Sequence, residues 1–148
     1  MSDLTNPAET TRPAYVLDEQ VGFILRLVGQ RHSAIFQRLA PEGLTTTQFA
    51  AFVRLAELGE CSQNELGRRT AMDVATIKGV VDRLRRKGMV TLRDDPHDKR
   101  RALLSVAPDY AHLTDDLYSV GLRISAETLE PLNRDEQRTL LRLLKKLR

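Results

Sequence analysis

The sequence has few of the residues that anchor disulfides, metals or stacked bases. Its 148 residues include one cysteine, three histidines and no tryptophan. One cysteine cannot form an internal disulfide or a multi-cysteine zinc site, and such usage is typical of a reducing compartment. The chain also lacks a phosphate-binding glycine loop, a G-x-S-x-G motif and an H-E-x-x-H motif. We therefore expect no enzyme activity, no cofactor and no metal site.

Long hydrophobic runs are also missing. No apolar stretch approaches the roughly 20 residues that span a bilayer, and the N-terminal segment lacks the basic and apolar regions of a signal peptide. Hydrophobic residues make up 41% of the chain and charged residues 29%, which is typical of a globular protein. The length suits one domain. These features predict a single globular domain in the cytoplasm without membrane contact.

Charge is distributed unevenly along the chain. The net charge is only +3, from 23 Lys and Arg against 20 Asp and Glu. Between Arg68 and Arg101, however, eleven basic residues stand against five acidic ones, so this segment carries +6 and the remainder −3. The same segment has no Phe, Tyr or Trp, which disfavours single-stranded RNA because unpaired bases stack on aromatic rings. The pattern indicates a basic module for an anionic partner.

The regions flanking this module carry helical patterns. Residues 1–14 have no hydrophobic period and are expected to form a mobile arm. Apolar residues at alternating three- and four-residue spacing predict long helices in regions 15–40 and 108–148. Pro108 is expected to begin the first helix of the second region, and Asn133 to cap its last helix. Two long apolar seams beside a small module predict an intermolecular bundle, and therefore a homodimer.

The middle segment, residues 44–107, has the element order of a winged helix-turn-helix. Three patterns of capping residues predict its helices: Thr45 with Gln48, Ser62 with Glu65, and Asp73. Gly88 is expected to end the third helix, and two β-prone runs around a charged turn predict a hairpin. The order predicts a mainly α fold with a small β-wing, whose third helix fits the major groove of DNA.

The exposed side of that third helix and the hairpin tip supply candidate DNA contacts. Early helix residues reach base edges, small residues permit close approach, and basic residues donate to guanine or phosphate. The candidates are Val74, Ala75, Thr76, Lys78, Gly79 and Arg83 on the helix, and Lys99, Arg100 and Arg101 on the hairpin. Two structural alternatives stay open: a solvated helix end for the basic run 83–87, and tight internal packing for Gly79.

These motifs resemble the MarR family of bacterial transcriptional regulators. The resemblance covers nearly the whole chain after the arm. It is carried by the segments 44–49, 64–69, 73–90 and 94–101, and above all by Val81-Asp82-Arg83-Leu84 followed by Asp98-Lys99-Arg100. It implies a bacterial winged-helix homodimer in which Asp98 orients Arg100 and the terminal helices form the dimer.

The resemblance also implies a repressor that leaves a pseudo-palindromic operator when a small aromatic or phenolic anion binds between the dimer helices and the DNA reader. His32 interrupts an apolar seam and is the first candidate for this effector site. Arg26, Arg54 and Tyr118 are further candidates. A hydrogen-bonded interfacial histidine is the alternative for His32. Two other kinds of control stay open, by a protein partner or by oxidation of Cys61.

Overall fold

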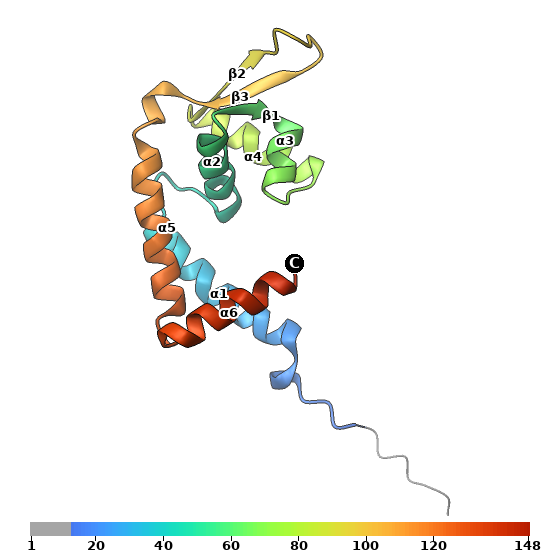
Figure 1. Cartoon of the computed structure of the whole chain (residues 1–148), viewed down its shortest axis with the longest axis vertical. Helices are drawn as coiled ribbons and strands as arrows, with labels where there is room; N and C mark the ends of the chain where they lie inside the picture. Colours follow the sequence, from blue (N-terminus) through green and yellow to red (C-terminus); the bar gives the residue numbers. More distant parts are fainter. Residues whose placement is uncertain (1–12) are drawn as a thin grey trace, which may run out of the picture.

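The computed structural model describes residues 13–148 (Figure 1). The expected arm over residues 1–14 therefore lies almost wholly outside the described residues. In chain order the elements are a 3-10 turn η1 (Leu17–Glu19), α1 (Val21–Leu39), α2 (Thr46–Leu58), β1 (Glu60–Ser62), α3 (Gln63–Arg69), α4 (Val74–Arg86), β2 (Val90–Asp94), β3 (Ala102–Val106), a second 3-10 turn η2 (Pro108–Tyr110), α5 (Leu113–Leu129) and α6 (Arg134–Lys146).

The elements form two parts, which we call the reader and the frame. The reader comprises α2, α3, α4 and the three strands, and the frame comprises α1, α5 and α6. Figure 1 shows the reader at one end of the molecule, α1 and α6 at the other, and α5 running between them. Two connections join the parts, residues 40–45 before α2 and residues 107–112 before α5. The predicted mainly α architecture with a small β-wing is confirmed.

Three of the predicted caps, at Thr45, Asp73 and Asn133, have the expected geometry. The Thr45 amide donates to Gln48 Oε1 and the Gln48 amide donates to Thr45 Oγ1, each at 3.3 Å. Asp73 Oδ1 accepts from the Thr76 amide at 2.7 Å, which fixes the first turn of α4. This bond to a backbone amide is also the main reason that the pKa of Asp73 is lowered.

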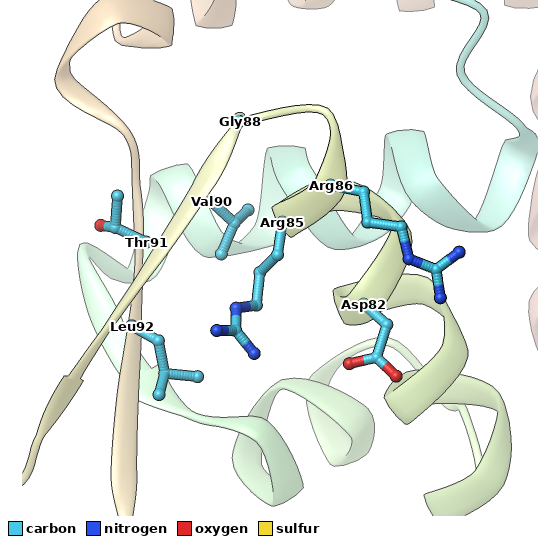
Figure 2. A pocket seen from close by; sticks show the side chains of 7 residues that line it. All are labelled: Asp82, Arg85, Arg86, Gly88, Val90, Thr91 and Leu92. Carbon is cyan, nitrogen blue, oxygen red and sulfur yellow. The ribbon is translucent and has the colours of Figure 1, made fainter.

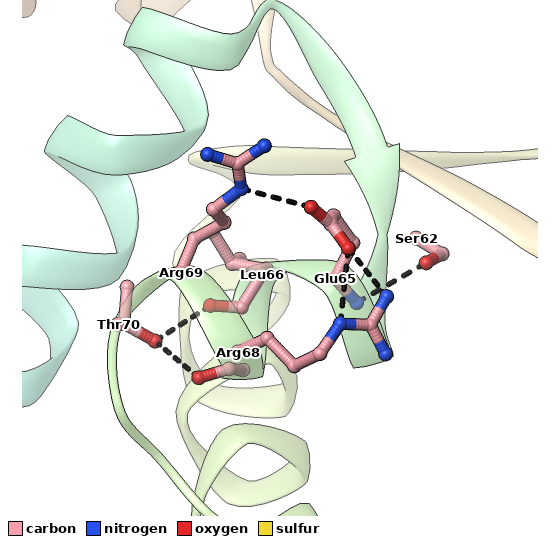
Figure 3. Close-up of polar contacts among 7 residues, drawn as sticks. Ser62, Glu65, Leu66, Arg68, Arg69 and Thr70 are labelled. Atoms are coloured by element: carbon pink, nitrogen blue, oxygen red, sulfur yellow. Dashed lines mark hydrogen bonds and ion pairs between the residues drawn. The ribbon is translucent and has the colours of Figure 1, made fainter.

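The capping box predicted at Ser62 forms only in part. Ser62 Oγ accepts from the Glu65 amide at 3.2 Å, but the Glu65 carboxylate faces the guanidinium groups of Arg68 and Arg69 (Figure 3). Two cationic donors hold a carboxylate more strongly than one backbone amide does. These bonds lower the pKa of Glu65. The expectation that Glu65 returns to the backbone of Ser62 is therefore wrong.

The sheet contains one strand that the sequence does not reveal. Its order is β1-β3-β2, and both pairs are antiparallel. Leu104 of β3 lies opposite Cys61 of β1 on one side and Leu92 of β2 on the other. The β2–β3 hairpin is predicted by its turn residues, whereas the three residues of β1 are too short to show a period. They become a strand only by pairing with β3.

Each element of the reader contributes to one core, and Leu113 and Leu117 of α5 in the frame are buried in the same core. The predicted inner face of α4, residues Ile77, Val80, Val81 and Leu84, is buried. It packs with fully buried side chains from the neighbouring elements, namely Phe52, Leu55, Leu66, Met89 and Leu104. A smaller cluster joins α1 to α5 and is linked to the reader by the edge-on contact of Phe36 with Phe49, at 5.4 Å between ring centroids. The reader can therefore hold α4 rigidly.

The helix expected to run from Pro108 is divided. Pro108 begins only the 3-10 turn η2, and α5 begins at Leu113. The Ala107 amide donates to the Met89 carbonyl at 2.8 Å, which ties the chain to the end of α4 before α5 can start. The apolar seam of α5 is otherwise as predicted, since Leu117 and Ile124 are buried.

Candidate nucleic-acid interface

The outer face of α4 presents the predicted helix contacts. Val74 is 70% exposed, and Ala75, Thr76, Lys78 and Arg83 are exposed as well. The Nζ atom of Lys78 lies 3.2 Å from Asp82 Oδ2, one helical turn away. Since the opposite face of α4 forms the core of the reader, these side chains project from a rigid helix. The structure brings the six candidates together on one partly or fully exposed surface.

Gly79 lies in open surroundings. A Cβ atom built at Gly79 would meet only Arg83 Nη1, at 4.0 Å. Gly67 in α3 differs, because a Cβ atom there would lie 3.2 Å from both Ile77 Cγ2 and the Met72 carbonyl oxygen. Tight packing within the described part of the chain therefore accounts for the glycine at 67 but not for the one at 79.

The wing carries its three candidates between β2 and β3. The side chain of Arg100 is 93% exposed, and its Nε atom lies 3.5 Å from Asp98 Oδ1. The same carboxylate oxygen accepts from the Arg100 amide at 3.0 Å. Lys99 and Arg101 are also exposed. Asp98 thus lies where it would restrict both the backbone and the side chain of Arg100.

Asp95 is a wing residue that sequence reasoning misses. Its side chain is only 10% exposed, and Oδ2 lies 3.3 Å from Arg101 Nε. Oδ1 accepts from the His97 amide at 2.9 Å, while the Asp95 amide donates to the Arg101 carbonyl at 3.1 Å. Asp95 therefore closes the turn of the wing from inside. The available signal was the Asp95-Pro96 pair, since Asp before Pro favours a turn that binds a nearby amide.

Depressions with basic residues lie on both sides of the wing. The first lies between α4 and β2, and Figure 2 shows Arg85 extending into it from α4, with Asp82 and Arg86 nearby. The second lies between α3 and the wing and is lined by Asn64, Arg68, Arg100 and Arg101, among others. Arg93 is exposed but paired within the protein, because it donates two hydrogen bonds, at 2.6 and 2.7 Å, to the Glu60 carboxylate.

The four predicted effector residues are distributed over three helices, with Arg26 and His32 on α1, Arg54 on α2 and Tyr118 on α5. His32 Nδ1 lies 2.9 Å from Thr128 Oγ1 of α5, and the Arg26 guanidinium lies 5.3 Å from the ring centroid of Phe23. Tyr118 is 39% exposed on α5.

Arg54 lines a cavity of about 480 Å³ beside α2, the end of α3 and the C-terminus. Phe49 and Val53 supply an apolar wall, and Arg148 approaches from the chain end. The Arg54 Nη1 atom also lies 2.9 Å from Glu57 Oε2. An apolar wall beside arginine side chains suits a small aromatic anion.

Cys61 lies in surroundings that suppress thiolate formation. It is buried in β1, and burial raises the pKa of its thiol, with the nearby Glu65 carboxylate acting in the same direction. Because the thiolate is the form that reacts with oxidants, this environment disfavours oxidative control through Cys61.

Two further features of residues 13–148 concern metal ions and membranes. These residues contain no group of three His, Cys, Asp or Glu side chains placed to hold a metal ion. Within the same range, no helix is both long and apolar enough to cross a membrane.

The reader combines three packed helices, of which α4 has an exposed outer face, with a basic two-stranded wing. This arrangement defines a winged helix-turn-helix protein. Residues 42–101 match the MarR family. NicR of Pseudomonas putida, an HTH-type transcriptional repressor, is 39% identical over 150 residues, which cover 99% of this chain and 95% of NicR. The chain therefore belongs to the MarR family of transcriptional regulators, as its sequence motifs predict.

Solved structures of related proteins have the same fold. A probable transcriptional regulator from Pseudomonas aeruginosa is 47% identical, with a TM-score of 0.86 over 90% of this chain and 100% of that chain. BpsR of Bordetella bronchiseptica, whose DNA binding is regulated by 6-hydroxynicotinic acid, is 36% identical, with a TM-score of 0.84 over 90% of this chain and 96% of its own.

Proposed function

We propose that this protein is a transcriptional repressor of the bacterial cytoplasm that binds a pseudo-palindromic duplex operator as a homodimer. The observation that carries the proposal is the exposed face of α4 next to the basic wing. In this arrangement α4 would enter the major groove with Val74, Ala75, Thr76, Lys78, Gly79 and Arg83 toward the bases and phosphates. Lys99, Arg100 and Arg101 would contact the flanking backbone or the minor groove.

The frame supports the dimer. No residue of α6 is buried among the described residues, although this helix and the residue after it contain five leucines. On α1, large apolar side chains are likewise exposed, among them Val21, Leu25 and Val28. Apolar surfaces of this kind are unfavourable in water, and a two-fold partner that presents the same surfaces would cover them. Two readers would then face successive major grooves about 34 Å apart.

The experiment that tests DNA binding begins by selecting bound duplexes from genomic fragments. With about four phosphate-contacting cations per protomer, log affinity should fall with log salt at a slope of about −7. Arg100→Ala should weaken binding to the selected duplex by about tenfold, since it removes a charge-assisted contact. Salt-independent association with duplex, or a preference for the matching single strand, would contradict the proposal.

We further propose that a small aromatic or phenolic anion releases the protein from its operator. The support is the likeness to BpsR, together with the cavity that Arg54 lines. His32, Arg26 and Tyr118 are the other proposed contacts, to be completed by the partner subunit. His32→Ala should blunt release by 6-hydroxynicotinic acid or salicylate while it spares operator binding, as measured by fluorescence anisotropy of labelled duplex. An unchanged response in the variant would remove His32 from the site.

A further inference from the structure

The C-terminal end of α4 is fixed by a glycine and two backbone hydrogen bonds. Gly88 follows the helix with a φ of 73°, the left-handed conformation that glycine adopts readily. The Gly88 amide donates to the Arg85 carbonyl at 2.9 Å, and the Met89 amide donates to the Leu84 carbonyl at 3.0 Å. This pair of bonds ends the helix sharply. Lys87 is the last residue before the reversal.

Lys87 does not point outward as its basic neighbours do. Arg85 and Arg86 are exposed, whereas Lys87 is half-buried. Its Nζ atom donates to the Glu42 carbonyl at 2.6 Å. A Cβ atom at Gly43 would lie 3.5 Å from the same ammonium group, so the lysine tip lies directly over this loop. The charge of Lys87 is therefore directed to the protein's own backbone.

The loop that receives Lys87 has an uncommon conformation. Glu42 has a φ of 59° and Gly43 a φ of 63°, and the left-handed conformation is unfavourable for a residue other than glycine. The Leu44 amide closes the turn on the Pro41 carbonyl at 3.2 Å. Residues 40–45 are one of the two connections between frame and reader.

The other connection, residues 107–112, also contacts the end of α4. The Tyr110 hydroxyl donates to the Lys87 carbonyl at 3.4 Å, and the Ala107 amide donates to the carbonyl of Met89, two residues after Lys87, at 2.8 Å. Ala107 and Tyr110 both belong to the segment 107–112 that leads into α5. One residue at the end of α4 thus contacts both segments that attach the reader to the frame.

We propose that Lys87 is a positioning residue that fixes the angle of α4 relative to the frame through its contacts with Glu42 and Tyr110. The proposal rests on the proposed function, in which α4 reads DNA and the frame forms the dimer. In a dimer, a small rotation of each reader changes the distance between the two reading helices. Lys87 contributes to DNA recognition by holding this geometry, and it does not bind phosphate itself.

The first test needs neither DNA nor a dimer. Lys87→Met keeps the aliphatic stem and removes the ammonium, and Arg85→Met makes a comparable change at an exposed neighbour. We expect hydrogen exchange of the full chain to accelerate in segment 40–45 in Lys87→Met, which loses the bond from Nζ to the Glu42 carbonyl. In segment 107–112 it should accelerate in Tyr110→Phe, which loses the bond to the Lys87 carbonyl. Arg85→Met should change neither segment. Lys87→Gln, whose shorter polar tip cannot reach Glu42, provides the same comparison if the methionine variant fails to fold. Unchanged exchange in either segment overturns the proposal.

The second test separates positioning from phosphate contact. On the duplex selected by the wild-type protein, Lys87→Met should lower affinity by about tenfold and leave the salt slope unchanged. A phosphate contact would instead lower the magnitude of the slope by about 1 per protomer. A reduced slope, or an unchanged affinity, overturns the proposal. If the exchange difference is present but the wild-type protein binds no duplex, the proposed function fails while the contact between α4 and the two connections stands.

Discussion

At the scale of single residues, two glycines of the reader are expected to respond in opposite ways to the same substitution. Gly67→Ala places a methyl group 3.2 Å from Ile77 Cγ2 and from a backbone oxygen. The resulting shift of α3 against α4 outweighs the gain in helix propensity, because overpacking costs roughly 1–3 kcal/mol and the gain is at most about 1 kcal/mol. The free energy of unfolding, measured in urea, should fall by about 1 kcal/mol.

Gly79→Ala is the matched variant. Its methyl group enters open space, so the free energy of unfolding should rise by roughly 0.5–1 kcal/mol. The same methyl group stands on the outer face of α4, where it should weaken duplex binding if Gly79 approaches the DNA closely. A loss of stability in Gly79→Ala would show that packing, in the monomer or the dimer, requires this glycine.

At the scale of elements, α1 is attached to the end of α5 by polar contacts. Arg31 donates to the Thr128 carbonyl at 2.5 Å and to the Glu127 carbonyl at 2.8 Å. The carboxylate of Glu127 pairs with Arg38 and lies 3.5 Å from Arg123. The hydrogen bond from Arg38 is the main cause that lowers the pKa of Glu127. The frame therefore depends on an ionised carboxylate.

This dependence predicts a loss of stability in acid. Because the folded-state pKa of Glu127 is lowered, its contribution is complete above its ordinary pKa of about 4.3 and is lost as the pH falls through the folded-state value. Glu127→Gln should be less stable than the wild type at pH 7, and the two should converge as the pH falls through the lowered folded-state pKa of Glu127, in urea unfolding at fixed protein concentration. Glu130→Gln makes the same charge change at an exposed position and serves as control. A difference that does not depend on pH would contradict the assignment.

The elements that the sequence predicts well are those with local signals. Asp73, Thr45 and Gln48 cap helices because each bonds to an amide within three residues. The strand β1 and the carboxylate of Glu65 escape prediction for the opposite reason. β1 exists through its pairing with β3, and Glu65 has arginine partners that compete with the amide of Ser62. The candidate site differs in the same way. Local patterns in the sequence predict α4 and the wing, whereas the turn that Asp95 closes depends on its contacts with Arg101.

At the scale of the whole molecule, the small net charge conceals an uneven distribution of charge. The basic segment 68–101 belongs to the reader, and the residues outside it carry a net negative charge. The excess of basic charge is therefore concentrated at the proposed DNA surface. The residues outside the segment include the frame, whose exposed leucines suit a protein partner. The proposed attraction to DNA and the proposed association of subunits therefore belong to different parts of the molecule, the reader and the frame.

This separation predicts that the dimer can be disrupted without damage to the reader. Leu143→Glu combined with Leu147→Glu places two charges on the apolar face of α6, where Leu143 is 45% and Leu147 72% exposed in the single chain. Sedimentation at micromolar concentration should show a dimer for the wild type and a monomer for the variant. Arg142→Gln, on the polar side of α6, also makes the charge more negative and should remain dimeric.

The monomeric variant should keep the reader but lose the paired contact with DNA. Far-ultraviolet circular dichroism should still show the folded helices, because α6 contributes no side chain to the core of the reader. The salt slope on duplex should fall from about −7 to about −3.5, since half of the phosphate contacts are gone. A variant that sediments as a dimer would place the interface elsewhere on the frame. A monomer with an undiminished slope would show that one reader makes all of the phosphate contacts.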